Sequence, residues 1–242
     1  MATRDDHLSA RLEPFDSYWQ GPGNIEAGYR TFGLYYRRNI LPRMPRDRNA
    51  PVLAVSCGPG YLVNLLVEEG YTNVLGIDSA PEKIAYAEKR KLPCRVDRGF
   101  SHLQNHPNTY ECIVCEQEVN HLAQPELIEW LELCHRALTP DGFLIVYGLN
   151  ASNPIVSIDA VGQNIDHFHL VSEYSLKQYG ELGGFRETRP FALELYVFYS
   201  NPLNYVAIAV TGLLHFAFRC LYKLYGKNAT IFTKKIGAVC QK

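Results

Sequence analysis

Short apolar runs alternate with amphipathic segments through the middle of the chain. The continuous apolar run at 52–56 is typical of a parallel strand that is buried on both faces, and further strands are expected at 73–78, 110–116 and 142–149. A shorter strand is expected at 93–97. The amphipathic segments between them predict helices at 61–69, 79–91 and 124–138, with Ser79 as the cap of the second. Strands and helices that alternate at this spacing predict an α/β fold with a doubly wound, mostly parallel sheet.

The two ends of the chain differ from this pattern. Residues 1–50 are rich in aromatic side chains and arginine, and they contain an expected helix at 24–41. In the last third we expect a helix at 172–184, a strand at 185–199, an unusually apolar helix at 202–226 and a final strand at 229–242. We therefore divide the chain into an N-terminal helical cap or lid (1–50) and one α/β domain (51–242) that contains the apolar helix as an insertion.

Composition limits the function classes. The 242 residues are 47% hydrophobic and 20% charged, as in ordinary globular proteins. The formal net charge of −1 provides no overall field for nucleic acid, so a nucleic-acid partner is not expected. The N-terminus lacks the apolar core of a signal peptide, and the seven cysteines are scattered. These features favour a reducing, cytoplasmic setting.

The loop SCGPG at 56–60 joins the first strand to the first helix. Its glycines allow a ligand to approach the backbone, and the helix N-terminus offers free N–H groups. Asp78 lies twenty residues after Gly58, where a carboxylate can accept both hydroxyls of a ribose. Val63 stands at the third-glycine position of a dinucleotide loop, and no lysine follows, which excludes a P-loop. The alternative is a tight turn beside a surface aspartate.

Five motifs, in order, resemble those of class I S-adenosylmethionine-dependent methyltransferases. They are VLAVSCGPG (52–60), VLGIDSAPEKIAYAEKR (74–90), YECIVCEQEVNHL (110–122), LCHRALTPDGFLIVYGLN (133–150) and LKQYGELGGF (176–185). The resemblance implies a Rossmann-like sheet of seven strands, with the last inserted antiparallel between the fifth and the sixth. It also implies S-adenosylmethionine as the cofactor.

The same resemblance implies which residues bind the cofactor. The methionine part and the turn would be lined by Ser56, Cys57, Gly58 and Gly60, and the ribose would lie on Asp78 beside Ser79. The remaining implied residues are Asp97, Gly99 and Phe100 around the adenine, and Glu116 and Gln117 at the methyl-transfer site.

Two positions depart from the family pattern. Ala54 stands where the family often has an acid, and Ser56 replaces the first glycine. Loss of a charged hydrogen bond costs on the order of 1–3 kcal/mol, which weakens a site without abolishing it. Serine is a mild change unless the position needs a positive φ. We therefore expect an active enzyme, and a catalytically silent cofactor-binding protein is the alternative.

Methyl transfer to a hydroxyl needs a base, and histidine suits this role near neutral pH. His121 follows the fourth strand and His167 follows the fifth, so both are expected where the fold binds substrate. His169 is a third candidate. A metal site of Asp166, His167 and His169 is a minority alternative, because three adjacent ligands make a poor zinc site. Cys112 and Cys115 read as buried thiols, and no metal is expected.

The acceptor is less constrained than the cofactor. The segments after the fifth strand resemble, more loosely, methyltransferases of bacterial cell-surface glycan and sugar-modification pathways. We therefore expect transfer to an oxygen of a small-molecule or glycan-type acceptor. A small aromatic acceptor, such as a quinone or polyketide, is the alternative.

The apolar helix needs a cover. Within 206–218 only Thr211, Gly212 and His215 interrupt the apolar run, which predicts a segment too short and interrupted to span a bilayer. A homodimer or a cap formed by the chain itself is the first expectation. Peripheral membrane contact through 203–225 is the second, because basic residues follow the helix.

Overall fold

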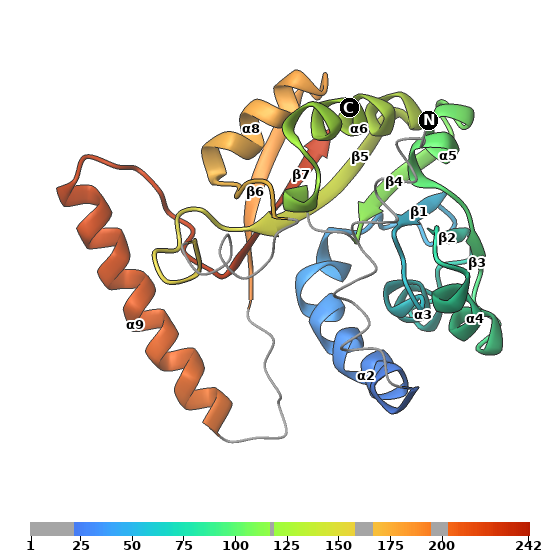
Figure 1. Cartoon of the computed structure of the whole chain (residues 1–242), viewed down its shortest axis with the longest axis horizontal. Coiled ribbons are helices and arrows are strands. Elements are labelled where there is room, and N and C mark those ends of the chain that lie inside the picture. Colours follow the sequence, from blue (N-terminus) through green and yellow to red (C-terminus); the bar gives the residue numbers. More distant parts are fainter. Residues whose placement is uncertain (1–21, 117–118, 158–166, 195–202) are drawn as a thin grey trace.

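A single seven-stranded sheet forms the centre of the molecule. The structure, a computed structural model, describes residues 22–116, 119–157, 167–194 and 203–242. The strand order is β3-β2-β1-β4-β5-β7-β6 (Figure 1). The strands are β1 (Val52–Val55), β2 (Val74–Asp78), β3 (Cys94–Val96), β4 (Tyr110–Cys115), β5 (Leu138–Leu149), β6 (Glu187–Leu193) and β7 (Lys235–Gln241).

Strand directions confirm the predicted topology. The pairs from β3 through β5 are parallel, whereas β7 runs antiparallel to both β5 and β6. The last strand is therefore inserted between the fifth and the sixth. Since β6 lies at the edge of the sheet, Pro190 is tolerated there without the loss of an internal ladder bond.

Helices cover both faces of the sheet. The described helices are α2 (Pro22–Asn39), α3 (Tyr61–Glu68), α4 (Pro81–Lys89), α5 (Gly99–Asn105), α6 (Gln124–Ala137), α8 (Glu173–Leu182) and α9 (Leu203–Leu224). Figure 1 shows α5, α6 and α8 on one side of the sheet, and α2, α3 and α4 on the other. The strands alternate between the two sides: Leu53 and Val55 join one apolar core, while Val52 and Ala54 join the other.

The N-terminal region contributes to one of these cores. Helix α2 lies against α3, and Tyr36 of α2 and Ile40, the residue after its end, are buried together with Leu62 and Leu66 of α3. The connector after α2 adds Met44 to the same core. Residues 1–21 of the expected cap lie outside the described residues.

The structure corrects three local expectations. Ala80, not Ser79, is the N-cap of α4, and the Asp78 carboxylate accepts its N–H. Strand β5 starts at Leu138, immediately after α6, whereas the sequence predicted that this strand begins at 142. Helix α5 was not predicted, because seven residues between a short strand and a polar loop give little periodicity.

Helix α9 stands away from the α/β body (Figure 1). Its segment Tyr205–Leu224 is long and apolar enough to cross a membrane by length and composition, with a mean hydropathy of 1.5. The expectation that it is too short and interrupted to do so is therefore wrong. None of this segment is buried, so no described part of the chain provides the expected cap.

Candidate functional site

The loop after β1 exposes its backbone at the carboxyl edge of the sheet. Three of its residues have a left-handed backbone: Ser56 (φ 58°), Gly58 (φ 53°) and Gly60 (φ 81°). The N–H of Cys57 donates to the carbonyl of Ile77, and the hydroxyl of Tyr29 donates to the carbonyl of Pro59 at 2.7 Å. A Cβ on Gly58 would meet no atom of the described residues within 4 Å, so none of them covers this part of the loop.

Ser56 occupies a conformation that favours glycine. A left-handed backbone costs a residue with a Cβ about 1–2 kcal/mol relative to its ordinary conformations. The replacement of the family's first glycine is thus not the mild change that serine represents elsewhere. The loop nevertheless adopts the turn, since its neighbours are held by hydrogen bonds from both sides.

A substitution pair measures this strain. We expect Ser56→Gly to be more stable than Ser56→Ala by about 1 kcal/mol, because both lose the hydroxyl but only glycine loses the Cβ. For a chain of this size the difference corresponds to a melting temperature about 2–4 °C higher. Thermal unfolding followed by circular dichroism checks it. Equal melting temperatures for the two variants would contradict the strained loop.

Asp78 connects the loop to the next helix. Its side chain is largely buried, with 6% of the residue exposed. The N–H of Gly58 donates to Oδ2 at 2.8 Å, and the N–H of Ala80 donates to Oδ1 at 2.9 Å. A carboxylate has about four acceptor positions, so each oxygen keeps capacity for one more donor. The arrangement presents two fixed acceptors beside the open part of the loop, and Ser79 follows, half-buried.

Asp97 is held in place by a chain of side chains. Its Oδ2 lies 2.8 Å from Nδ1 of His102, and Nε2 of His102 lies 2.7 Å from the hydroxyl of Tyr110. Burial lowers the pKa of His102, so the neutral ring donates from Nδ1 to Asp97 and accepts from Tyr110 at Nε2. Partial burial would raise the pKa of Asp97, but hydrogen bonds from His102 and the Arg98 N–H outweigh it and lower that pKa.

Gly99 and Phe100, the two residues expected beside Asp97, contact the sheet and its apolar core. Gly99 begins α5, and a Cβ there would approach Cγ1 of Val55 to 3.1 Å. Phe100 is buried in the core between the sheet and α5. The role of Asp97, Gly99 and Phe100 around an adenine stays a prediction.

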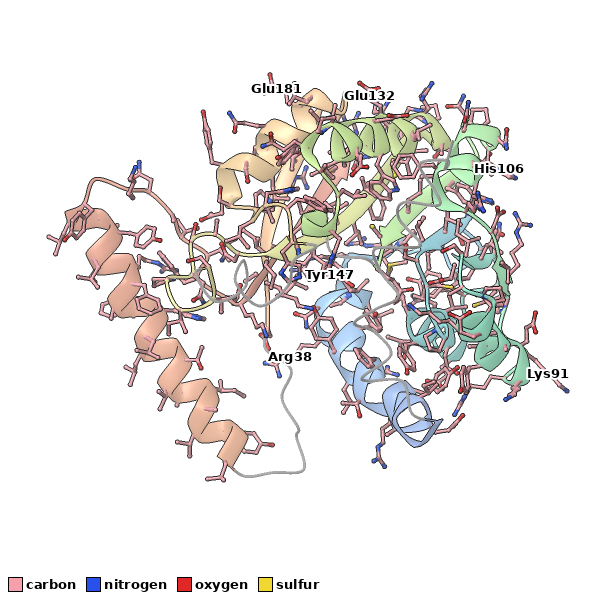
Figure 2. All side chains as sticks on the ribbon, in the orientation of Figure 1. Arg38, Lys91, His106, Glu132, Tyr147 and Glu181 are labelled. Carbon is pink, nitrogen blue, oxygen red and sulfur yellow. The ribbon has the colours of Figure 1, made fainter. Side chains whose placement is uncertain are left out.

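Glu116 follows β4 with its carboxyl group turned into the protein. The hydroxyl of Tyr36 donates to Oε2 at 2.7 Å, while Oε1 is buried and has no hydrogen-bond partner. The hydroxyl of Tyr147 donates to the main-chain carbonyl of Glu116. Figure 2 shows Tyr147 where the sheet meets α2. Burial, more than any neighbour, raises the pKa of Glu116 well above its usual range, so the site holds a neutral acid.

The protonated Glu116 makes stability depend on pH. Because its pKa is higher in the folded than in the unfolded chain, folding takes up a proton once the pH exceeds the unfolded value. We expect the wild-type protein to lose up to about 1.4 kcal/mol per pH unit relative to Glu116→Gln as the pH rises from about 5. Urea unfolding of both proteins between pH 5 and 7 measures this difference. Parallel curves would show that Glu116 is ionised in the folded state.

The structure brings the two expected bases together. His121 ends a short 3-10 helix (Val119–His121) after β4, and His167 follows the loop after β5. Their ring centroids lie 4.7 Å apart in an edge-to-face arrangement. His169 lies apart from the pair's ring contact: its ring packs near Tyr179, and burial lowers its pKa.

Asn120 holds this part of the site. It is fully buried, its Oδ1 accepts the N–H of Leu149 at 3.2 Å, and its carbonyl accepts the N–H of Phe168 at 2.9 Å. These bonds tie the turn that carries His121 to β5 and to the segment that carries His167. The pairing of the two histidines therefore rests on main-chain contacts as well as on the rings.

Two expectations fall on residues that are not described. Gln117 lies outside the described residues, and so does Asp166 of the alternative metal site. Within the described ranges no group of three histidine, cysteine, aspartate or glutamate side chains could hold a metal ion.

Sequence reasoning missed three residues that shape the site. They are Tyr147 and Asn120, which act through contacts about 30 residues apart, and His102, whose partners Asp97 and Tyr110 lie within eight residues of it. A tyrosine at the end of an otherwise apolar strand was the available signal for Tyr147. Tyr36 was expected only as one aromatic residue of the cap, and its bond to Glu116 joins positions 80 residues apart.

Known proteins share both the sequence pattern and the fold. Residues 52–142 match the methyltransferase domain family. The ubiquinone biosynthesis O-methyltransferase of Serratia proteamaculans (strain 568) is 26% identical over 166 residues, which are 65% of this chain and 67% of that relative. The corresponding protein of Yersinia enterocolitica matches over 66% of its length, so the chain spans about two thirds of these relatives.

A solved structure completes the comparison. A S-adenosylmethionine-dependent methyltransferase from Archaeoglobus fulgidus has a similar fold, with a TM-score of 0.67 and 19% identity over 94% of this chain and 98% of that one. The chain carries a class I S-adenosylmethionine-dependent methyltransferase domain. It is an enzyme of that class, and its cofactor is S-adenosylmethionine. Phosphoethanolamine N-methyltransferase 2 of Haemonchus contortus, solved with S-adenosyl-L-methionine, has a TM-score of 0.58 and 14% identity over all of this chain and 60% of that one.

The residues of this methyltransferase domain fit the cofactor. Open space above Gly58 accommodates a ligand against the loop, and Asp78 has acceptor capacity for the two ribose hydroxyls. The buried Oε1 of Glu116 has no hydrogen-bond partner among the described residues, so a polar group of a bound ligand can satisfy it. Ala54 is fully buried in the apolar core, so an acid at that position is not part of this site.

Proposed function

We propose that the enzyme transfers the methyl group to a hydroxyl oxygen of a small-molecule acceptor. The contact between His121 and His167 after the carboxyl ends of β4 and β5 is the observation that carries the proposal. Ligands of doubly wound folds bind at this edge of the sheet. The likeness to O-methyltransferases of ubiquinone biosynthesis supports oxygen as the methylated atom.

Bound S-adenosylmethionine supplies an electrophilic methyl group on a positively charged sulfur. The residues of this chain have to orient the acceptor and remove its proton. The imidazole of His121 or His167 would accept the proton of the acceptor hydroxyl while its oxygen takes up the methyl group. Asp78 and the loop at 56–60 hold the cofactor while this happens, and Glu116 borders the transfer site.

Among hydroxyl acceptors we favour a small aromatic one. The names of the relatives, which refer to ubiquinone biosynthesis, support this class. The glycan-type acceptor expected from the sequence stays a prediction. We also propose a cytoplasmic setting, since all seven cysteines are free thiols.

A transfer assay separates these acceptors. Methyl-labelled S-adenosylmethionine is incubated with the full chain and a panel of phenols, catechols, sugars and amines. Labelled aryl methyl ether is the expected product. Label on sugars alone would replace the aromatic acceptor by a glycan type, and label on amines alone would contradict oxygen transfer. Cofactor binding without any transfer would support the silent protein.

A further inference from the structure

The largest exposed apolar surface of the described chain lies on α9, outside the methyltransferase site. Leu213 and Phe216 are 72% and 66% exposed, and Leu203 and Leu224 near the two ends are exposed as well. Surfaces of this kind mark an interaction site or a membrane contact. We propose that α9 is a membrane anchor that lies within one leaflet of an anionic bilayer.

The exposed apolar side chains of α9 extend too far around the helix for one protein partner to cover them. The less exposed positions Thr211, His215, Phe218 and Tyr222 recur at helical spacing and form a single stripe. At 100° per residue, Leu214 and Phe216 lie about 160° apart around the helix, and both are exposed. A second helix packs along one seam of such a surface, so it could not cover both sides. Lipid chains can cover all of it.

Charge selects an anionic surface. Residues 195–242 contain no aspartate or glutamate and six basic residues, so they carry +6 in a chain of net −1. Three of these cations, Arg219, Lys223 and Lys227, lie in the last turns of α9 and just after it, and all are exposed. Basic residues at one end of an apolar helix attract acidic headgroups, each by about 1 kcal/mol.

The chain segments that connect α9 to the sheet indicate whether the helix crosses the bilayer or lies within one leaflet. Strand β6 ends at Leu193 and β7 begins at Lys235, and these two residues are paired in the sheet. The chain segments before and after α9 therefore start from and return to the same place in the sheet. If α9 crossed the bilayer, the nine residues between Leu193 and Leu203 would have to cross back as extended chain, which covers about 30 Å at most. Such a backbone leaves its polar groups unsatisfied in lipid, so a helix within one leaflet is the consistent arrangement.

The base of the helix is firmly joined to the domain. Asn150 donates to the carbonyls of Ile231 and Thr233, and Asn153 donates to that of Phe232 at 2.7 Å. Phe218 and Tyr222 of α9 pack on Phe232. Since β5 ends at Leu149, opposite Lys235, this base lies at the carboxyl edge of the sheet. An anchored protein therefore turns the edge that carries the cofactor loop toward the membrane.

Vesicle binding by the full chain tests the anchor without any acceptor or turnover, so its outcome is independent of the proposed function. We expect co-sedimentation with vesicles of phosphatidylcholine and phosphatidylglycerol, and weaker binding to phosphatidylcholine alone. The double variant Leu213→Glu and Phe216→Glu should lose at least about tenfold in affinity. Leu182→Glu on α8, where the leucine is 58% exposed, is the matched control and should bind as the wild type does.

A second pair of variants tests the charge. Lys223→Glu with Lys227→Glu should lose most of the preference for anionic vesicles. Lys91→Glu, on the side of the molecule away from α9 in Figure 2, should keep it. Light scattering without vesicles tests the alternative that a second copy of the chain covers α9 in a dimer. A dimer that α9 variants dissociate, or a monomer that ignores both vesicle types, would overturn the proposal.

The position of the two ends tests the single leaflet. Cys220 is the exposed cysteine of α9, and a nitrobenzoxadiazole label there should shift to shorter wavelength on vesicles. The same label at the other end, in Tyr205→Cys with Cys220→Ser, should be reduced by external dithionite to the same extent. If one end were protected until the vesicles are permeabilised, the helix would span the bilayer.

Discussion

Replacing Asp78 by alanine should weaken S-adenosylmethionine binding about 10–100-fold. The carboxylate fixes the N–H groups of Gly58 and Ala80, and its remaining acceptor positions fit the two ribose hydroxyls. Two hydrogen bonds to a charged acceptor are worth this range in affinity. Titration calorimetry with S-adenosylmethionine and with S-adenosylhomocysteine measures it, because both carry the same ribose.

A second carboxylate provides the control. Asp141 is exposed and lies in β5 toward the opposite end of that strand from Leu149, so Asp141→Ala should leave the affinity unchanged. Melting temperatures of both variants distinguish a lost ligand contact from an unfolded loop. Full affinity in a folded Asp78→Ala protein would remove Asp78 from the cofactor site.

Replacing His121 or His167 by alanine should lower turnover about 100-fold or more, while cofactor affinity stays nearly unchanged. A positioned base contributes this much to a reaction that must remove a proton. The rings are in contact, so the two substitutions should not be additive, and the double variant should be little slower than the slower single variant. Steady-state kinetics with the acceptor found in the transfer assay measures all three.

His169 is the matched control for the pair. It lies two residues from His167, but its ring packs near Tyr179, and its two buried ring nitrogens have no hydrogen-bond partner among the described residues. We expect His169→Gln to keep turnover within a few-fold of the wild type. Wild-type rates in both His121→Ala and His167→Ala would assign proton removal to water or to another group of the chain.

The cofactor loop has features that the sequence predicted and one that it did not predict. The order of strand, glycine turn and helix, with Asp78 at the end of the next strand, could be read from local pattern. The left-handed backbone of Ser56 could not be predicted from local pattern, because the identity of a serine does not specify its backbone conformation. Only the turn imposes the left-handed one. Likewise Ser79 is of a residue type that often caps helices. In the structure the carboxylate of Asp78 instead accepts the N–H of Ala80, which is the N-cap of α4.

The sequence by itself determined the seven-stranded α/β fold, the loop at 56–60 and the positions of Asp78, Glu116, His121 and His167. The α/β class, the loop and Asp78 depend on periodicity or spacing within short segments, whereas the seven-strand arrangement and Glu116 were implied by the resemblance to the methyltransferase family. Only the tertiary structure decided that Tyr36 bonds to Glu116, that His121 meets His167 and that no described part of the chain covers α9. The reason is physical: these facts depend on contacts between segments distant along the chain, and on which apolar surface finds a partner, whereas local pattern reports only that a surface is apolar.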